Sequence, residues 1–280
     1  MALRAQVATE PALPRRRHVR FWFGIGMLAI LVCAALLSLP FNSAVYGQDI
    51  TARLVGPSVG HLFGTDSLGR DVLARTIAGL RISLEISLVS VLIGCGCGLL
   101  IGAISGYYGG VLDALLMRVT DAVLAVPVVL LAISVIAVVG GGLVNLIAVI
   151  ALTQWMLYAR TARGETLVIK REPYVIAARS LGAKDSHIIV THVLPQLLPT
   201  TLVLATLGVS EAVLLEAGLS FLGLGIQPPD PSLGSLLAEG QQYIVRAPWL
   251  AIFPGVVIFL VVLAINSCGD GFRTVLDRKR

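Results

Sequence analysis

Long apolar segments alternate with short polar ones along the chain. An α-helix needs about 20 apolar residues to span the hydrocarbon core of a bilayer. A chain that crosses lipid must also satisfy its backbone polar groups internally. The pattern therefore predicts an all-α integral membrane protein with about six transmembrane helices. The expected spans are residues 21–40, 83–106, 112–139, 143–158, 200–225 and 249–268.

The polar segments divide the chain further. The first span is too long for the apolar region of a signal peptide, and no convincing cleavage site follows it, so we expect a retained anchor. The predicted organisation is a basic tail over 1–20, the first span over 21–40, an extracytoplasmic loop over 41–81, a five-helix core over 82–270 that includes a cytoplasmic loop over 160–196, and a tail over 271–280.

Composition supports the membrane assignment. Of the 280 residues 56% are hydrophobic and 13% charged, whereas a soluble domain carries about 25% charged residues. The net charge of +5 is spread between apolar blocks, unlike the concentrated basic face of a nucleic-acid binder. The four cysteines form no CxxC pair or Cys/His cluster, so we expect packing roles for them and no metal site.

Basic residues set the expected topology, because cytoplasmic loops of membrane proteins carry an excess of Lys and Arg. With six spans and the N-terminus inside, most of the 21 Lys and Arg fall on the inner side. This distribution predicts a multi-pass protein with both termini in the cytoplasm. The outer segments keep only Arg53, Arg70, Arg75, Arg81 and Arg246.

Glycines recur through the second span at a spacing that permits close helix packing. Gly98, Gly102 and Gly106 are each four residues apart. In membranes such small-residue faces let two helices approach closely. The pattern predicts a packed bundle and does not by itself indicate a channel.

The cytoplasmic loop between the fourth and fifth spans is polar but patterned. Pro173 suits the first turn of a helix that starts near Glu172. Gly182 suits the position just after the end of that helix. Apolar side chains recur on the predicted helix at helical spacing: Tyr174, Ala177, Ala178 and Leu181.

A second short helix is predicted over 186–193. Asp185 or Ser186 can cap its start, and it should stop before Pro195. Two helices joined by a glycine turn are typical of a docking element. The alternative is an interfacial helix pair that lies on anionic lipid.

His187 and His192 lie in the second predicted helix. Residues five apart on an α-helix point about 140° away from each other. No carboxylate or cysteine completes a site with them, so we expect no metal here.

The run from Tyr174 to Pro195 resembles the EAA motif of bacterial ABC-importer permeases. Its core is EAA, a glycine four residues later and a terminal LP. Ile176 stands where the motif has Glu, which removes a charge available to pair with an ATPase. The positions that fit are Ala177, Ala178, Gly182, Leu194 and Pro195.

Further motifs narrow the resemblance. Residues 61–71 (HLFGTDSLGRD), 106–110 (GYYGG), 219–229 (LSFLGLGIQPP) and 247–250 (APWL) are similar to the dipeptide/oligopeptide/nickel permease family, specifically its second, C-type, permease subunit. The similarity runs from about residue 20 to residue 277 in the family order.

The resemblance implies a bacterial inner-membrane permease that pairs with a related second subunit. One or two cytoplasmic ATPases and an extracytoplasmic substrate-binding protein would complete the importer, which most closely fits di- or oligopeptides. Nickel or another small solute is the alternative cargo. The loop would act as a coupling helix, with contributions from Ile176, Ala177, Ala178, Arg179, Leu181, Gly182, Ala183, Asp185, His187, His192 and Pro195.

The chain lacks GxxxxGK[ST], the motif that cradles nucleotide phosphates. We therefore expect a transport subunit that is not an enzyme and binds no cofactor, with ATP and magnesium held by partner subunits. Three carboxylates fall within predicted spans, where charges are costly and often functional. One of them lines the path and faces a peptide's amino terminus or shapes its gate. The alternative is that they are hydrogen-bonded between helices, or protonated. They are Glu216, Glu211 and Glu85.

Three other protein classes compete with this interpretation. A proton-coupled secondary transporter could use Glu211 or Glu216, but it leaves the patterned loop unexplained. An intramembrane hydrolase could use Ser220, but no histidine falls inside a span and GxSxG is absent. A structural assembly subunit would differ in that no binding protein would stimulate ATP turnover through it.

Overall fold

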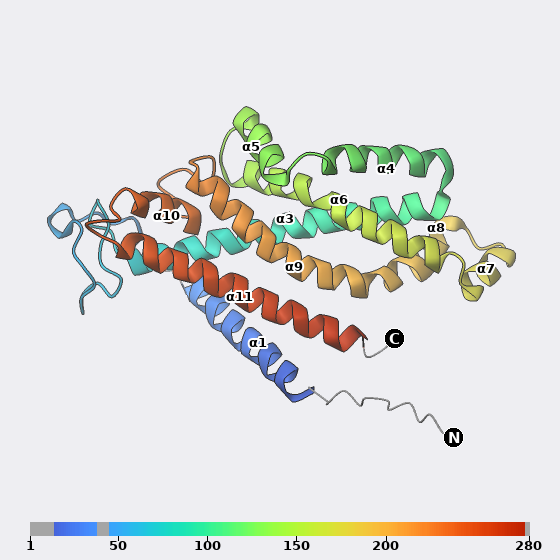
Figure 1. Ribbon diagram of the computed structural model, residues 1–280, viewed down its shortest axis with the longest axis horizontal. Helices are drawn as coiled ribbons and strands as arrows, with labels where there is room; N and C mark the ends of the chain where they lie inside the picture. Colours follow the sequence, from blue (N-terminus) through green and yellow to red (C-terminus); the bar gives the residue numbers. More distant parts are fainter. Residues whose placement is uncertain (1–13, 38–44, 278–280) are drawn as a thin grey trace, which may run out of the picture.

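The computed structural model describes residues 14–37 and 45–277, which form an elongated helical bundle (Figure 1). Helix α1 (Pro14–Leu37) lies beside α11. The described residues contain no β-strand, so the predicted all-α class is confirmed. Four helices run along most of the bundle: α3 (Val72–Tyr108), α6 (Leu143–Ile169), α9 (Leu194–Phe221) and α11 (Trp249–Asp277).

Helix length and hydropathy support most of the predicted spans. Among the described residues, four helical segments are long and apolar enough to cross a membrane, and a bent pair of helices makes a fifth. The sixth rests on α1, whose described apolar part, Phe21–Leu36, is shorter. The end of the predicted span 21–40 lies outside the described residues.

The predicted third span, 112–139, is not one continuous helix. Helix α4 (Gly110–Leu124) and helix α5 (Val128–Val139) meet at an angle of 90°. Pro127 is the N-cap residue of α5. Proline lacks the N–H that a continuous helix would bond, and it disfavours helical dihedrals at the residue before it. These two effects explain the bend.

Several helices pass the predicted segment boundaries. Helix α3 begins at Val72, inside the predicted loop 41–81, because the Asp71 carboxylate accepts a hydrogen bond from the backbone N–H of Ala74 at 2.9 Å and caps its first turn. Four other helices also cross predicted boundaries: α1 begins at Pro14 inside the predicted tail 1–20, α6 ends at Ile169 and α9 begins at Leu194 inside the predicted loop 160–196, and α11 ends at Asp277 inside the predicted tail 271–280.

Glycines hold α3 directly against α6. A Cβ built on Gly94 would lie 3.0 Å from the carbonyl oxygen of Ala151, and one built on Gly106 would lie 2.8 Å from that of Arg163. Gly98 and Gly102 face the α6 backbone in the same way. The close packing predicted for these glycines is confirmed. The main apolar core surrounds this contact and draws on α3, α5, α6 and α9.

The 61–71 motif contributes two residues to a largely buried ion cluster at the end of the bundle opposite α7 (Pro173–Ser180; Figure 1). We define the ion cluster as Asp66, Arg70, Arg75 and Glu239, the last from α10 (Leu233–Gln241). Asp66 Oδ2 lies 2.6 Å from both Arg70 Nε and Arg75 Nη1. Glu239 contacts the same two arginines at 2.8 Å. The cluster therefore ties the loop and the start of α3 to α10.

Candidate functional site

Helix α7 (Pro173–Ser180) forms one tip of the bundle (Figure 1). It starts as predicted, with Pro173 in its first turn. It ends at Ser180, and Gly182 follows two residues later with a φ of +82°, in the left-handed region that glycine tolerates best. Val175 is buried, and Ala178 packs against the same apolar cluster. The inner face of α7 is thus fixed to the bundle.

The outer face of α7 and the turn after it leave apolar side chains exposed. Leu181 is 88% exposed, Ile176 54% and Tyr174 38%. The predicted stripe is therefore split: Ala178 turns inward, whereas Tyr174, Ala177 and Leu181 stay outside. An exposed apolar surface of this kind marks a contact with a partner or a membrane.

Tyr107 of α3 holds this tip in place. Its hydroxyl donates to Asp185 Oδ1 at 2.6 Å, and the Arg179 guanidinium lies 5.0 Å from the centre of its ring. One buried side chain thus contacts residues on both sides of the Gly182 turn. Sequence reasoning noted the 106–110 motif but gave Tyr107 no role, because the motif lies far from α7 in the sequence.

We expect Tyr107→Phe to loosen the tip without unfolding the bundle. The change removes a hydrogen bond to a carboxylate, which is worth about 1.5–3 kcal/mol and less at an exposed acceptor such as Asp185. Hydrogen exchange of the 176–188 amides should become roughly tenfold faster. Tyr108→Phe is the matched control, because Tyr108 is 54% exposed and packs edge-on against Tyr107. Equal hydrogen-exchange rates in both variants would show that the Tyr107 hydroxyl does not hold the tip in place.

The second predicted helix differs from expectation. Helix α8 (Asp185–Ile188) has no side-chain cap and continues through the π-helix η2 (Ile189–Val193) into α9. The helix therefore does not stop before Pro195. Pro195 lies in the first turn of α9, where its missing N–H is tolerated, and the wider π turn precedes it.

The π-helix also corrects the expected geometry of the two histidines. His187 and His192 have ring centres 6.4 Å apart and do not point in nearly opposite directions. A π turn closes with i→i+5 hydrogen bonds, so residues five apart come onto one side. Tyr174 continues the row, 5.8 Å from His192. The described residues contain no group of three metal-binding side chains.

The predicted coupling residues thus gather at this tip, and most are accessible. Ala178, Ala183 and His192 are half-buried. The exposed members are Ile176, Ala177, Arg179, Leu181, Gly182, Asp185, His187 and Pro195.

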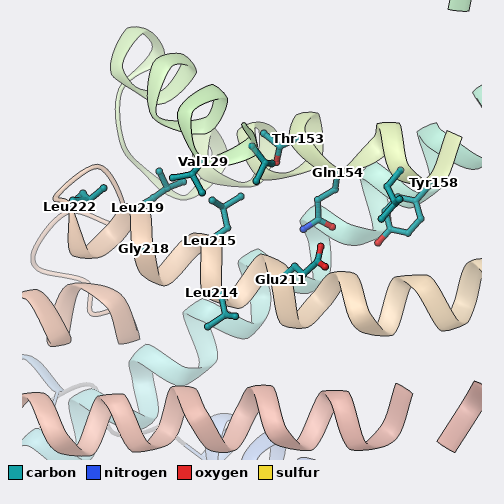
Figure 2. A pocket seen from close by; sticks show the side chains of 12 residues that line it. Val129, Thr153, Gln154, Tyr158, Glu211, Leu214, Leu215, Gly218, Leu219 and Leu222 are labelled. Atoms are coloured by element: carbon teal, nitrogen blue, oxygen red, sulfur yellow. The ribbon is translucent and has the colours of Figure 1, made fainter. Parts of the chain in front are cut away.

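A cavity of about 440 Å³ opens within the membrane-spanning part, between α5, α6 and α9 (Figure 2). Leucines and valines form most of its wall. Its polar side chains are Thr153, Gln154, Tyr158 and Glu211, and Glu211 points toward Gln154 and Tyr158. Sequence reasoning missed Gln154 and Tyr158, since one polar residue in an apolar helix gives no signal of what it faces.

Only one of the three candidate carboxylates lines this cavity. Glu216 is fully buried, and its two oxygens accept hydrogen bonds from Ser83 at 2.7 Å and Ser220 at 2.6 Å. It fits the alternative that we left open, a carboxylate bonded between helices, and does not fit a path position. Glu85 is exposed on α3 away from the cavity, which leaves Glu211.

Comparison with known proteins agrees with the helical membrane bundle. Residues 98–280 match the family described as binding-protein-dependent transport system inner membrane component. The chain is 41% identical over 266 residues to the glutathione transport system permease protein GsiD of Pectobacterium atrosepticum, covering 94% of this chain and 88% of that protein. The proteins of the same name from Escherichia coli O6:K15:H31 and Shigella boydii serotype 4 are 41% identical over 267 residues, covering 95% of this chain and 88% of each protein.

These matches confirm the resemblance found in the motifs and set aside the secondary transporter and the hydrolase. The chain belongs to the family of binding-protein-dependent inner-membrane transport components, and it is a multi-pass permease subunit of an ABC importer that is not itself an enzyme.

Proposed function

We propose that this chain forms one half of the translocation path of an importer for short peptides. Two observations support the proposal. The relatives named above are glutathione permeases, and glutathione is itself a small peptide. The cavity that contains Glu211 has an apolar wall with a few convergent polar groups, which is the usual character of a small-molecule site.

We further propose that α7 and the Gly182 turn dock on a cytoplasmic ATPase. The observation that carries this proposal is the exposed pair Ile176 and Leu181, presented on a helix whose inner face is fixed by Val175 and Tyr107. A helix held rigidly on the bundle transmits a displacement of the ATPase, whereas a flexible loop would absorb it. In the complete importer ATP and magnesium would be bound by the ATPases, and a second permease subunit and a binding protein would complete the assembly.

The same proposal places both chain ends in the cytoplasm. From the end of the bundle near α10, both α1 and α11 run toward the α7 end, so the Pro14 end of α1 and the Asp277 end of α11 point that way (Figure 1). Membrane proteins concentrate Lys and Arg on their cytoplasmic side. Arg171, Arg179 and Lys184 lie in or beside α7 and are all exposed, which supports this orientation.

We expect Leu181→Asp to separate coupling from folding. Leu181 is 88% exposed and contributes little to the fold, so the yield of membrane-inserted protein should stay unchanged. A charge in the centre of an apolar contact costs several kcal/mol. Capture of the purified ATPase and transport-linked ATP turnover should therefore fall at least tenfold.

Leu181→Met is the matched control and should behave like the unchanged protein. Ile176→Glu restores the charge that the EAA motif has at this position, and because Ile176 is 54% exposed it should keep full yield and equal or stronger ATPase capture. The docking proposal fails if Leu181→Asp captures the ATPase normally. If Leu181→Asp instead weakens binding of the tip to anionic vesicles, the surface lies on lipid.

A further inference from the structure

Gln154 lines the Glu211 cavity and carries an unpaired hydrogen-bond acceptor that is buried beside Gly208. Its side-chain Nε2 donates to the carbonyl oxygen of Gly208 at 3.3 Å. The amide cannot be turned round, because its oxygen would then face that carbonyl oxygen. Its Oε1 has no partner among the described residues, although Gln154 is only 9% exposed. A buried acceptor left without a donor costs about 1–3 kcal/mol.

Glu211 adds a second acceptor on the same side of the cavity (Figure 2). No hydrogen bond or ion pair holds its carboxylate within the described part of the chain. None of the residues that line the cavity is Lys, Arg or His. A carboxylate and an amide oxygen that face each other across apolar walls repel, unless a donor or a cation lies between them.

We propose that Glu211 and Gln154 form a binding site for the primary ammonium group of the cargo, the amino terminus of a peptide. An ammonium between them would supply the donor that both acceptors lack, with the Tyr158 hydroxyl as a third neighbour. Because Gln154 Oε1 is buried in the unliganded conformation, the Gln154 side chain rotates toward the cavity to accept from the ammonium. The apolar wall formed by Leu215 and Leu219 would take the side chain of the first peptide residue. This inference rests on the proposed function, because it places the cargo in this cavity.

The size of the cavity suits this ligand. About 440 Å³ is enough for the first residue of a peptide but falls at the small end of typical ligand pockets. The site therefore recognises the terminal ammonium and one side chain and does not discriminate between sequences in the rest of the peptide. A single charged contact in an otherwise apolar wall also limits affinity, which a path needs if the cargo is to leave.

Carbodiimide labelling tests the site directly. Dicyclohexylcarbodiimide couples to carboxyl groups in apolar surroundings, and mass spectrometry measures its attachment to each glutamate of the assembled importer in native membranes. The amine of phenylalaninamide can also capture the activated carboxyl as an amide with release of dicyclohexylurea, so labelling is counted as the carbodiimide adduct plus this amide. We expect phenylalaninamide, a primary ammonium with an apolar side chain, to slow this total labelling of Glu211 about tenfold at ten times its Kd. N-acetyl-phenylalaninamide has the same side chain without the ammonium and should give no protection.

Internal controls and variants keep the test decisive. Glu85, outside the cavity, should be labelled at one rate in all conditions. Gln154→Leu should keep Glu211 labelling but weaken protection about tenfold, since a bond to a charged donor is lost. Protection by both amides, or by neither, overturns the proposal. Protection by neither is also the outcome if a basic side chain of the second permease subunit already pairs with Glu211.

Transport separates this inference from the proposed function. In proteoliposomes with the partner subunits and binding protein, ATP-driven uptake of trialanine tests whether the importer carries peptides at all. Glu211→Gln should then lower uptake of trialanine at least tenfold. Unchanged uptake with Glu211→Gln overturns the ammonium site and leaves the peptide function standing. Absence of uptake by the unchanged importer contradicts the function, while protection of Glu211 by phenylalaninamide would still support the site.

Discussion

Gly102→Val should abolish the folded bundle, whereas Gly96→Val on the same helix should leave it intact. A Cβ on Gly102 would lie 2.7 Å from the Ala162 side chain and 2.8 Å from the Arg163 backbone nitrogen. A Cβ on Gly96 would meet nothing within 4 Å. The same substitution carries the same helix propensity at both sites, so the difference reports packing alone.

The expected difference in stability between the two variants is large because the new side chain at residue 102 would collide with the backbone of α6. Overpacking a core with extra methylene groups costs about 1–3 kcal/mol when side chains can move aside. The α6 backbone cannot move aside without shifting the whole helix, so we expect the upper end of that range or more. Yield of monodisperse protein in detergent and the midpoint of thermal unfolding measure the effect. Equal yields for the two variants would show that α3 and α6 are not packed backbone to backbone.

Asp66→Asn should destabilise the loop end of the bundle by about 3–5 kcal/mol, the usual cost of removing one partner from a buried ion pair. Asp66 is 2% exposed and carries the charge between Arg70 and Arg75. Asparagine keeps the shape but leaves two buried guanidinium groups that share only Glu239. Thermal unfolding of the purified protein at pH 7.5 measures the loss. Asp49→Asn is the control, since Asp49 is an exposed carboxylate of the same loop.

The effect should depend on pH with a defined sign. Burial acts to raise the pKa of Asp66, but the backbone N–H of Arg70 and the charge of Arg75 outweigh it, so the pKa lies below its ordinary value of 3.8. A carboxylate with a lowered pKa stabilises the fold fully above its unfolded pKa and loses that contribution as the pH falls through its folded pKa. The stability gap between the two proteins should be constant down to about pH 5 and shrink below 3.8. A gap that widens in acid would contradict this account.

The fold was predictable wherever the signal lay in one segment. Apolar runs predicted the helices, and Gly98 and Gly102 predicted a close helix contact, which proves to be that of α3 with α6. Pro173 and Gly182 predicted the two ends of the α7 region. The bend at Pro127 was missed because hydropathy averages across it, although proline itself carried the signal.

The candidate sites were less predictable because they depend on contacts between distant segments. Tyr107 and Asp185 are 78 residues apart. Gln154 and Gly208 are 54 residues apart, and nothing near Gln154 in the sequence marks its unpaired oxygen. Glu211 and Glu216 look alike in the sequence, since both are acids in an apolar span. They differ in their neighbours: two serine hydroxyls donate hydrogen bonds to Glu216, whereas Glu211 lines a cavity.

Helix α3 contains no proline or break across its 37 residues, whereas α9 and α11 each contain an internal proline. At 1.5 Å per residue α3 is a rod about 55 Å long. One end is fixed in the ion cluster through Arg75, and the other carries the tip through Tyr107. Such a rod acts as a lever arm: a tilt of about 5° about one end moves the other by about 5 Å, close to the rise of one helical turn. With the ATPase docking proposed above, a displacement of one helical turn at the tip would become a rotation of only about 5° at the ion cluster, so the far end of α3 changes its orientation with little change of position.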